Sequence, residues 1–335
     1  MRAYSAPQAV SPAIDRTRRY LFHPFEMTTY LKLATVACVS EGFAANFSFA
    51  TGHRLATEAS DYGFFHPSDE KIAILVLVIL AGLICGVIAF YLVACFRFAF
   101  FHCLVHQTKE IRPAWNRYRF QAIRFFNSGL IVWIIFAIIS TAIVFPFAFN
   151  LYKLFHSSRM GVHYGFQSLF LLFVPLFVIV PIIALIAFVV DVVLHDFILP
   201  HMALENASFG AAWRAARTHI AAQKGSFVLY CFLRAALPVV ALIALLIVVG
   251  IPLVIIFGVL ATSASGFLDL LEDTTPLGAV FHVIFQILFG VLALGVGVLV
   301  EFGLGGPIAT WVRNYALLYY GGRYKALGDV LSPPA

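Results

Sequence analysis

The chain has 335 residues, of which 62% are hydrophobic and only 11% are charged, and its mean hydropathy is +0.94. A soluble domain carries about 25% charged residues, so this composition excludes a protein with a fully polar surface and favours one whose solvent is lipid. The formal net charge is +6, but the basic residues lie beside apolar runs, so we read the charge as a topology signal and expect no nucleic-acid partner.

The predicted elements are membrane-spanning helices. A helix needs about 20 apolar residues to cross the hydrocarbon core, and five runs reach that length. A sixth, at 27–50, is weaker because it contains Lys32 and Glu41, so it either spans or lies at the interface. We therefore predict an all-α, polytopic transmembrane helical bundle with about six spans, at 27–50, 72–96, 127–150, 168–190, 227–262 and 279–312.

The basic residues orient these spans. With the N-terminus inside, 17 of the 22 Lys and Arg residues fall on the inner side of the membrane. Because Lys and Arg are enriched in cytoplasmic loops, both termini are predicted to be cytoplasmic. The expected organisation is an N-terminal segment (1–26), a single six-helix transmembrane domain (27–320) and a C-terminal tail (321–335).

Two cytoplasmic connectors, 109–126 and 208–223, are predicted to be amphipathic surface helices, the second capped by Asn206 or Ser208. Basic helices with aromatic residues settle at the headgroup level and favour anionic lipid. Membrane lipids are therefore the expected partners, and the alternative is ordinary topology-setting loops. The candidate headgroup contacts are Arg112, Arg117, Arg119, Arg124, Arg214 and Arg217.

The last two spans are too long to cross the membrane as straight perpendicular helices. Gly250 and Pro252 are expected to kink or break the fifth span. Gly305 and Pro307 are likewise expected to break the sixth span, after which residues 311–320 are expected to emerge along the cytoplasmic surface.

Asp191, His195 and Asp196 form the sharpest polar cluster at membrane depth. Asp191 and His195 are four residues apart, so one helical turn places them on one face, where a carboxylate and an imidazole can relay protons or bind a cation. Two ligands on one helix are too few for a metal site, so no metal is predicted. Alternatively, the cluster lies at the membrane boundary and pairs with Arg97, Arg214 or Arg217.

Glu301 is the second candidate for an intramembrane polar or ion site. At least 20 largely apolar residues precede it, so it is expected deep in the sixth span. There it either pairs with Arg97 or Arg313 or lines a cavity.

Catalytic motifs are missing from the sequence. It holds no GxxxxGK[ST], HExxH, CxxC or GxSxG pattern, and we expect no cofactor and no catalytic residue. The first hypothesis is a non-enzymatic accessory or scaffold component of the membrane, with a membrane-protein partner or a second copy as possible associates. The second is a transporter that uses the acidic residues, and the third is a membrane-embedded enzyme that uses His195 and the aspartates.

Three segments, LFHPFEMTTYLKLATVACVSEGF, DVVLHDFILPHMALENASFGAAWR and FVLYCFLRAAL, resemble a family of uncharacterised prokaryotic multi-pass membrane proteins. Some of those proteins are labelled as the membrane domain of glycerophosphodiester phosphodiesterases, but no phosphodiesterase catalytic domain is present in this sequence. The resemblance implies a protein of the prokaryotic cytoplasmic (inner) membrane and supplies no catalytic residues. The positions that carry it are Asp196, Phe197, Pro200, Met202, Ala203 and Trp213.

Overall fold

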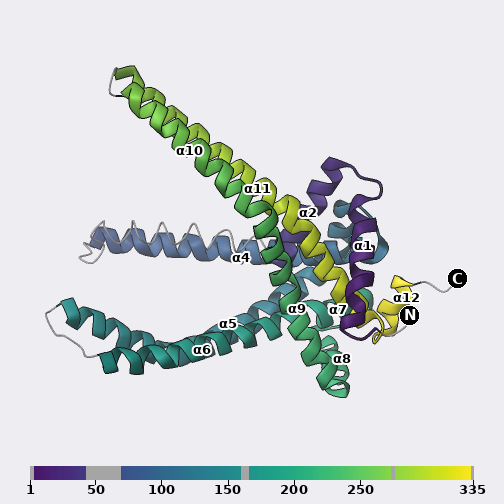
Figure 1. The fold of residues 1–335 in the computed structure, drawn as a ribbon. Coiled ribbons are helices and arrows are strands. Elements are labelled where there is room, and N and C mark those ends of the chain that lie inside the picture. The colour runs from purple at the N-terminus through teal and green to yellow at the C-terminus, as the bar shows by residue number, and fades with distance from the viewer. Residues whose placement is uncertain (1–3, 43–68, 160–165, 273–275, 333–335) are drawn as a thin grey trace. The chain divides into compact units, whose positions relative to one another are not determined.

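The computed structural model describes residues 4–42, 69–159, 166–272 and 276–332, and every regular element within those ranges is helical, as predicted. The chain divides into two compact units, unit 1 (Met1–Ala114 and Gly225–Ala335) and unit 2 (Trp115–Lys224). The elements drawn in Figure 1 are η1 (Pro7–Ala9), α1 (Val10–Phe22), α2 (Met27–Glu41), α4 (Asp69–His106), α5 (Ile111–Arg159), α6 (Phe166–Val192), η2 (Val193–Ile198), α7 (Leu199–Leu204), α8 (Phe209–Ala222), α9 (Lys224–Leu245), η3 (Leu246–Gly250), α10 (Ile251–Glu272), α11 (Pro276–Gly321) and α12 (Lys325–Leu331).

Five helical stretches within the described residues are long and apolar enough to cross a membrane. In each stretch, none of the residues in the most apolar 18-residue segment is buried by the rest of the protein. This is the pattern of a lipid-facing helix. They correspond to five of the six predicted segments. The stretches are Val76–His106, Ile111–Asn150, Phe173–Leu204, Lys224–Ser263 and Val283–Gly321.

The weaker segment at 27–50 is not among these five. Its described part is α2, whose 15 residues extend about 22 Å at 1.5 Å per residue, less than the roughly 30 Å of a hydrocarbon core. The helix ends at Gly42, whose φ of 76° is a left-handed conformation that glycine adopts without strain. Residues 43–50 lie outside the described residues, so a full span at 27–50 stays a prediction.

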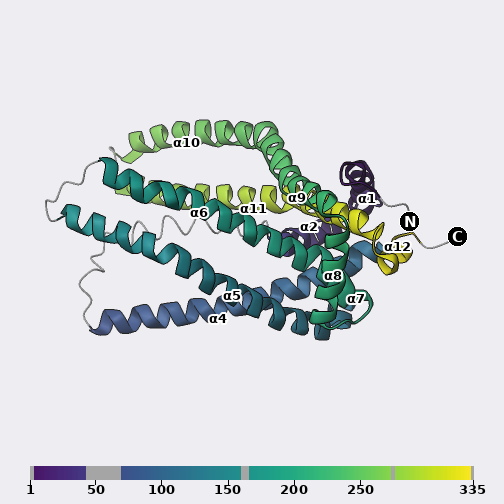
Figure 2. The ribbon, with the colours of Figure 1, turned by 90° about the horizontal axis from the view of Figure 1, so that it is seen from below.

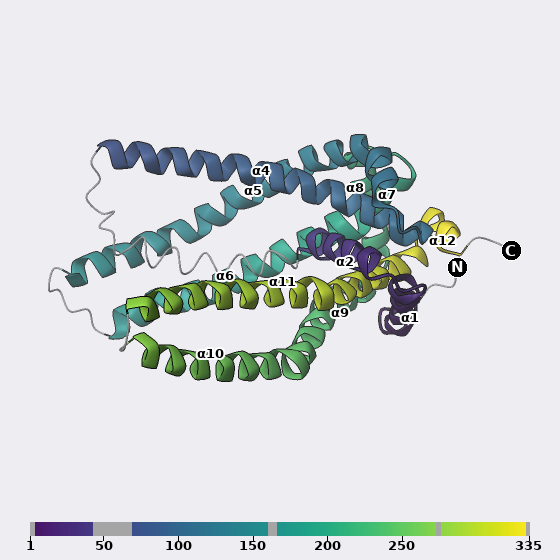
Figure 3. The same ribbon diagram turned by 90° about the horizontal axis from the view of Figure 1, so that it is seen from above.

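One end of unit 1 is densely packed with protein (Figure 3). This packed end consists of α1, α2, α12, the first half of α9, and the C-terminal parts of α4 and α11. Arg323 donates from Nη1 to the Tyr4 carbonyl over 2.9 Å, which joins the described N- and C-terminal segments. The Tyr230 and Tyr319 rings stack with their centroids 4.2 Å apart and fix α9 against α11.

Helix α1 is bonded to the end of α4. Arg16 donates from Nη2 to the Leu104 carbonyl at 2.8 Å, and the Tyr20 hydroxyl donates to the Thr108 carbonyl at 2.9 Å. Burial lowers the pKa of the Arg16 guanidinium, with the Arg19 charge adding to the effect, and burial raises the pKa of the Tyr20 phenol, which therefore keeps its proton for this bond. The N-terminal segment and the α4–α5 connection, which the charge pattern assigns to one side, thus lie together.

Helices α2 and α11 cross at two glycines. A Cβ added to Gly306 would lie 2.3 Å from the Ala34 Cβ, and one added to Gly305 would lie 3.3 Å from the Cys38 Sγ. The small residues therefore allow a close approach of the two helices. The Tyr30 hydroxyl also donates to the Gly303 carbonyl, so the contact combines packing with a hydrogen bond.

The expected break in the sixth span at Pro307 is wrong. Helix α11 continues through Pro307 to Gly321, and its residues 312–320 are buried within unit 1 instead of running along a surface. Asn314 illustrates the burial, because its Nδ2 donates to the Thr17 Oγ1 of α1 over 2.9 Å. The contacts with α1, α2 and α9 hold this part of α11 inside the packed end.

The opposite parts of α4, α10 and α11 are exposed and apolar, and we call them the apolar arms. Val254 on α10 is 72% exposed and Leu292 on α11 is 58% exposed. The α10 and α11 arms contact each other through the Phe257 and Phe289 rings, whose centroids are 5.7 Å apart. Lipid is the surrounding that removes the cost of exposing so many apolar side chains.

The expected kink in the fifth span is confirmed. The π-helical turn η3 at Leu246–Gly250 separates α9 from α10, and Figure 2 shows the bend between them. Pro252 follows directly in the first turn of α10 and has no N–H to donate to the carbonyl four residues earlier. The π-turn η3 accommodates the hydrogen bond lost at Pro252. A second π-turn, η2, ends two residues before Pro200 and accommodates the bond lost there in the same way.

Unit 2 contains most of α5, together with α6, η2, α7 and α8. The connector 109–126 is not a separate surface helix, because α5 runs unbroken from Ile111 to Arg159 and includes it. No residue between Ala114 and Phe145 interrupts a helix strongly enough to separate the two. The second connector is confirmed as α8, and the Ser208 Oγ caps it by accepting from the Ala211 N–H over 3.4 Å.

Candidate functional site

Two of the three residues of the Asp191 cluster in unit 2 are buried in the protein, and the position of the cluster at the membrane boundary stays a prediction. His195 is 1% exposed and Asp196 3% exposed, and both belong to η2, which packs against α7 and α8. Asp191, near the end of α6, is half-buried. Asp191 lies near the end of α6 and His195 lies in the π-turn that follows, so their placement on one helical face stays a prediction.

The arginines of α8 do not neutralise this cluster. Arg214 and Arg217 are both exposed on α8, and among the described residues neither forms an ion pair. The predicted pairing of these two residues with the aspartates is therefore wrong. The buried face of α8, formed by Ala212 and Ala216, contains no charge that could reach η2.

Glu301 lies in unit 1, in the C-terminal half of α11, and is half-buried. Its backbone carbonyl accepts from the Cys38 thiol over 3.7 Å. Within the described parts of the chain its carboxylate forms no ion pair, so the expected pairing with Arg97 or Arg313 is wrong. Arg97 donates from Nε to the Ser40 carbonyl at 2.9 Å, and the Arg313 guanidinium lies 5.9 Å from the centre of the Phe101 ring.

The predicted headgroup contacts on α5 lie in its N-terminal part. Arg112, Arg117 and Arg119 are exposed there. Arg124 donates from Nη1 to the Asn206 Oδ1 over 3.3 Å and lies 5.7 Å from the centre of the Phe120 ring. Exposed guanidinium groups beside aromatic rings are suited to the headgroup region of a bilayer.

A buried ion pair in unit 1 was not predicted from the sequence. The Arg234 guanidinium donates to the Glu41 carboxylate over 2.5 Å, and the two side chains are 10% and 1% exposed. The pair joins the end of α2 to α9. A signal was present in the sequence, since two opposite charges within apolar runs satisfy one another most cheaply by pairing.

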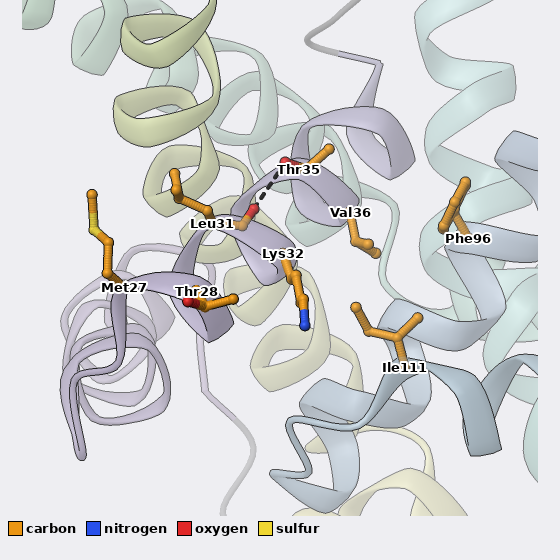
Figure 4. A pocket seen from close by; sticks show the side chains of 8 residues that line it. All are labelled: Met27, Thr28, Leu31, Lys32, Thr35, Val36, Phe96 and Ile111. Atoms are coloured by element: carbon orange, nitrogen blue, oxygen red, sulfur yellow. Dashed lines mark hydrogen bonds between the residues drawn. The ribbon is translucent and has the colours of Figure 1, made fainter.

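An open groove of about 510 Å³ lies along α2 and is a candidate site of unit 1 (Figure 4). Its lining is largely apolar, and Lys32 is the one charged side chain in it. Phe96 of α4 and Ile111 at the start of α5 form the facing wall. No pattern in the sequence predicts this groove, because its walls come from three separate segments. The lining residues are Met27, Thr28, Leu31, Lys32, Thr35, Val36, Phe96 and Ile111.

Metal chemistry has no support in the described part of the chain. No group of three or more His, Cys, Asp and Glu side chains there is placed to hold an ion. His201 and Glu205 of unit 2 form a local pair, with Nδ1 and Oε2 3.3 Å apart, but the pair comes from one turn of chain. The structure thus offers one basic apolar groove and one buried polar turn as candidate sites.

Comparison with known proteins gives one match. A model described as a family of unknown function (DUF7544) matches residues 4–330. No curated protein and no solved structure matches the chain. The match supports the expectation of a family without an assigned role, and it shows no link to the membrane domain of glycerophosphodiester phosphodiesterases.

Proposed function

Since the chain belongs to this family of unknown function, we propose from its geometry that it is a non-enzymatic accessory or scaffold component of the prokaryotic cytoplasmic membrane. The observation that carries the proposal is the division of unit 1 into a packed end and apolar arms. The arms anchor the protein among acyl chains, and the packed end presents a fixed surface at the headgroup level.

Basic side chains support a role at the cytoplasmic leaflet. Arg112, Arg117 and Arg119 are exposed at the start of α5, and Arg214 and Arg217 are exposed on α8 beside Trp213, which is 46% exposed. Each Lys or Arg near an anionic leaflet contributes about 1 kcal/mol of attraction. In this proposal the arginines orient each unit on anionic headgroups, and both termini face the cytoplasm.

The test is reconstitution of the full chain into vesicles of phosphatidylcholine with phosphatidylglycerol. A scaffold component should leave an imposed pH gradient and an imposed sodium gradient intact, and it should retain phosphatidylglycerol when it is extracted again in mild detergent. Dissipation of either gradient beyond that of protein-free vesicles would overturn the proposal in favour of transport.

Transport is the second candidate, and Glu301 is the observation that favours it. A carboxylate within a candidate span that forms no ion pair among the described residues is costly unless it serves a function. The helix bend at η3 adds the kind of discontinuity that transporters use at their binding sites. If the vesicles do show flux, Glu301→Gln should reduce it at least ten-fold, whereas the exposed control Glu26→Gln should leave it unchanged.

A further inference from the structure

We propose that the groove along α2 binds one anionic phospholipid, with its phosphate at Lys32 and the adjoining part of an acyl chain along the apolar wall. This inference rests on the proposed function and names the ligand of one surface of the protein.

Helix α2 has one face covered by protein and one face left open. The covered face contains Leu33, Ala34 and Cys38, which are 1%, 0% and 0% exposed and pack within unit 1. Thr28 and Lys32 are exposed on the open face, which forms the floor of the groove. The covered face locks α2 onto α11, so the open face is presented in a fixed orientation.

Lys32 supplies the cation of this face. Its side chain is exposed and projects into the space between α2 and the segment that carries Ile111 (Figure 4). Among the described residues its ammonium forms no hydrogen bond or ion pair. The Thr28 hydroxyl lies one turn away on the same face, while the Thr35 hydroxyl already donates to the Leu31 carbonyl over 2.8 Å. An ammonium beside a hydroxyl is suited to a phosphate oxygen.

The walls favour a lipid over a soluble anion. Phe96 and Ile111 offer an acyl chain an apolar contact that a free phosphate cannot use. Phe96 lies on the candidate span Val76–His106, on which Leu92, one turn earlier, is 40% exposed. The groove therefore continues onto the exposed apolar surface of a candidate span.

Charged residues that neighbour the groove residues in the sequence do not determine whether the groove prefers an anionic ligand. Lys109 and Arg112 flank Ile111, but the Lys109 ammonium donates to the Pro24 carbonyl over 2.8 Å, and the carboxylates of Glu26 and Glu110 are also close along the chain. The preference for an anion therefore depends on Lys32, which makes a single-residue test sharp.

The experiment is native mass spectrometry of the full chain in detergent, titrated with phosphatidylglycerol or with phosphatidylcholine. The wild type should retain one phosphatidylglycerol in preference to phosphatidylcholine. Lys32→Gln should weaken that binding about five-fold, the loss expected for one cation near the headgroup. Lys32→Arg should preserve it, and so should Lys325→Gln, which removes an equal charge from α12.

Two further measurements distinguish binding of a phospholipid in the groove from binding of a free phosphate at Lys32. Thr28→Trp fills the open groove while keeping the Lys32 charge, and it should also abolish the preferred site. Millimolar inorganic phosphate should not displace the lipid. Equal binding by wild type and Lys32→Gln, equal loss in Lys325→Gln, or displacement by phosphate would overturn the inference. If vesicles with the wild-type chain keep their gradients and the extracted protein retains phosphatidylglycerol, but Lys32→Gln binds that lipid as well as the wild type does, the groove inference fails and the scaffold proposal stands.

Discussion

The two ends of helix α11 show how one apolar sequence meets two different solvents. Leu292, in the arm, is 58% exposed, whereas Leu317, in the packed end, is 2% exposed. Both belong to the same unbroken helix, Pro276–Gly321. The first leucine avoids water by contacting lipid and the second by contacting protein, so hydropathy alone does not distinguish them.

Polar chemistry follows the same division in unit 1. The packed end contains the Arg16, Tyr20 and Arg323 hydrogen bonds to backbone carbonyls, and its α2 and α9 helices are joined by the Glu41–Arg234 ion pair. The arms are rich in Leu, Ile, Val and Phe. The directional contacts that fix the arrangement of helices in this unit therefore lie at the packed end. Substitutions should lower the stability of the protein much more at the packed end than in the arms.

Glu41→Gln should have the largest effect on stability. It removes the negative charge opposite a guanidinium that is 10% exposed, and breaking a buried ion pair costs about 3–5 kcal/mol. The midpoint of thermal unfolding in detergent should fall markedly, whereas Glu26→Gln, at an exposed residue preceding the same helix, should leave it nearly unchanged.

The double variant Glu41→Leu with Arg234→Met sharpens that prediction. Replacing both charges with apolar side chains should recover most of the lost stability, because neither ion is then left in a low-dielectric site. Equal unfolding midpoints for wild type and Glu41→Gln would mean that the pair does not hold α2 to α9.

The second prediction compares the two leucines of α11 directly. Leu317→Ala should destabilise the protein by about 2–5 kcal/mol, because it opens a cavity in a filled core. Leu292→Ala removes the same atoms from a lipid-facing position and should cost less than about 1 kcal/mol. Thermal unfolding of both variants in the same detergent gives the comparison, and similar losses at both positions would contradict the division into packed end and arms.

The sequence was sufficient for features that depend on local chemistry. Long apolar runs predicted five candidate spans, Pro252 predicted the bend at η3, and Ser208 was one of two predicted caps of α8. Each follows from a property of the residue itself, such as the missing N–H of proline or a hydroxyl that accepts from a free backbone N–H. The fusion of 109–126 with the following span was also readable, since no breaker separates them.

Features that depend on contacts between segments distant in the sequence could not be predicted from it. The tyrosines near the end of α11 match an interfacial belt as well as a core, and only the contact of Tyr319 with Tyr230 decides between them. In the sequence, Lys32 only indicated a weak span at 27–50. Its place in a groove could not be predicted, because Phe96 and Ile111, which complete the groove, come from other segments. Likewise, Pro307 was expected to break α11, and packing by α1 and α2 overrides that tendency.

Gly306→Ala should have the smallest of these effects, and it tests the closest contact of the packed end. The added Cβ would lie 2.3 Å from the Ala34 Cβ and 2.6 Å from the Ala34 Cα, so the α2 backbone itself would have to move, at a cost of about 1–3 kcal/mol. Gly290→Ala is the matched control on the α11 arm, where an added Cβ meets nothing within 4 Å. Replacing that glycine should be neutral or stabilising by up to about 1 kcal/mol, since alanine is the better helix former. An unfolding midpoint that rises in both variants would show that α2 is not held against α11 as closely as the glycines allow, and the fixed presentation of the open face of α2 would lose its basis.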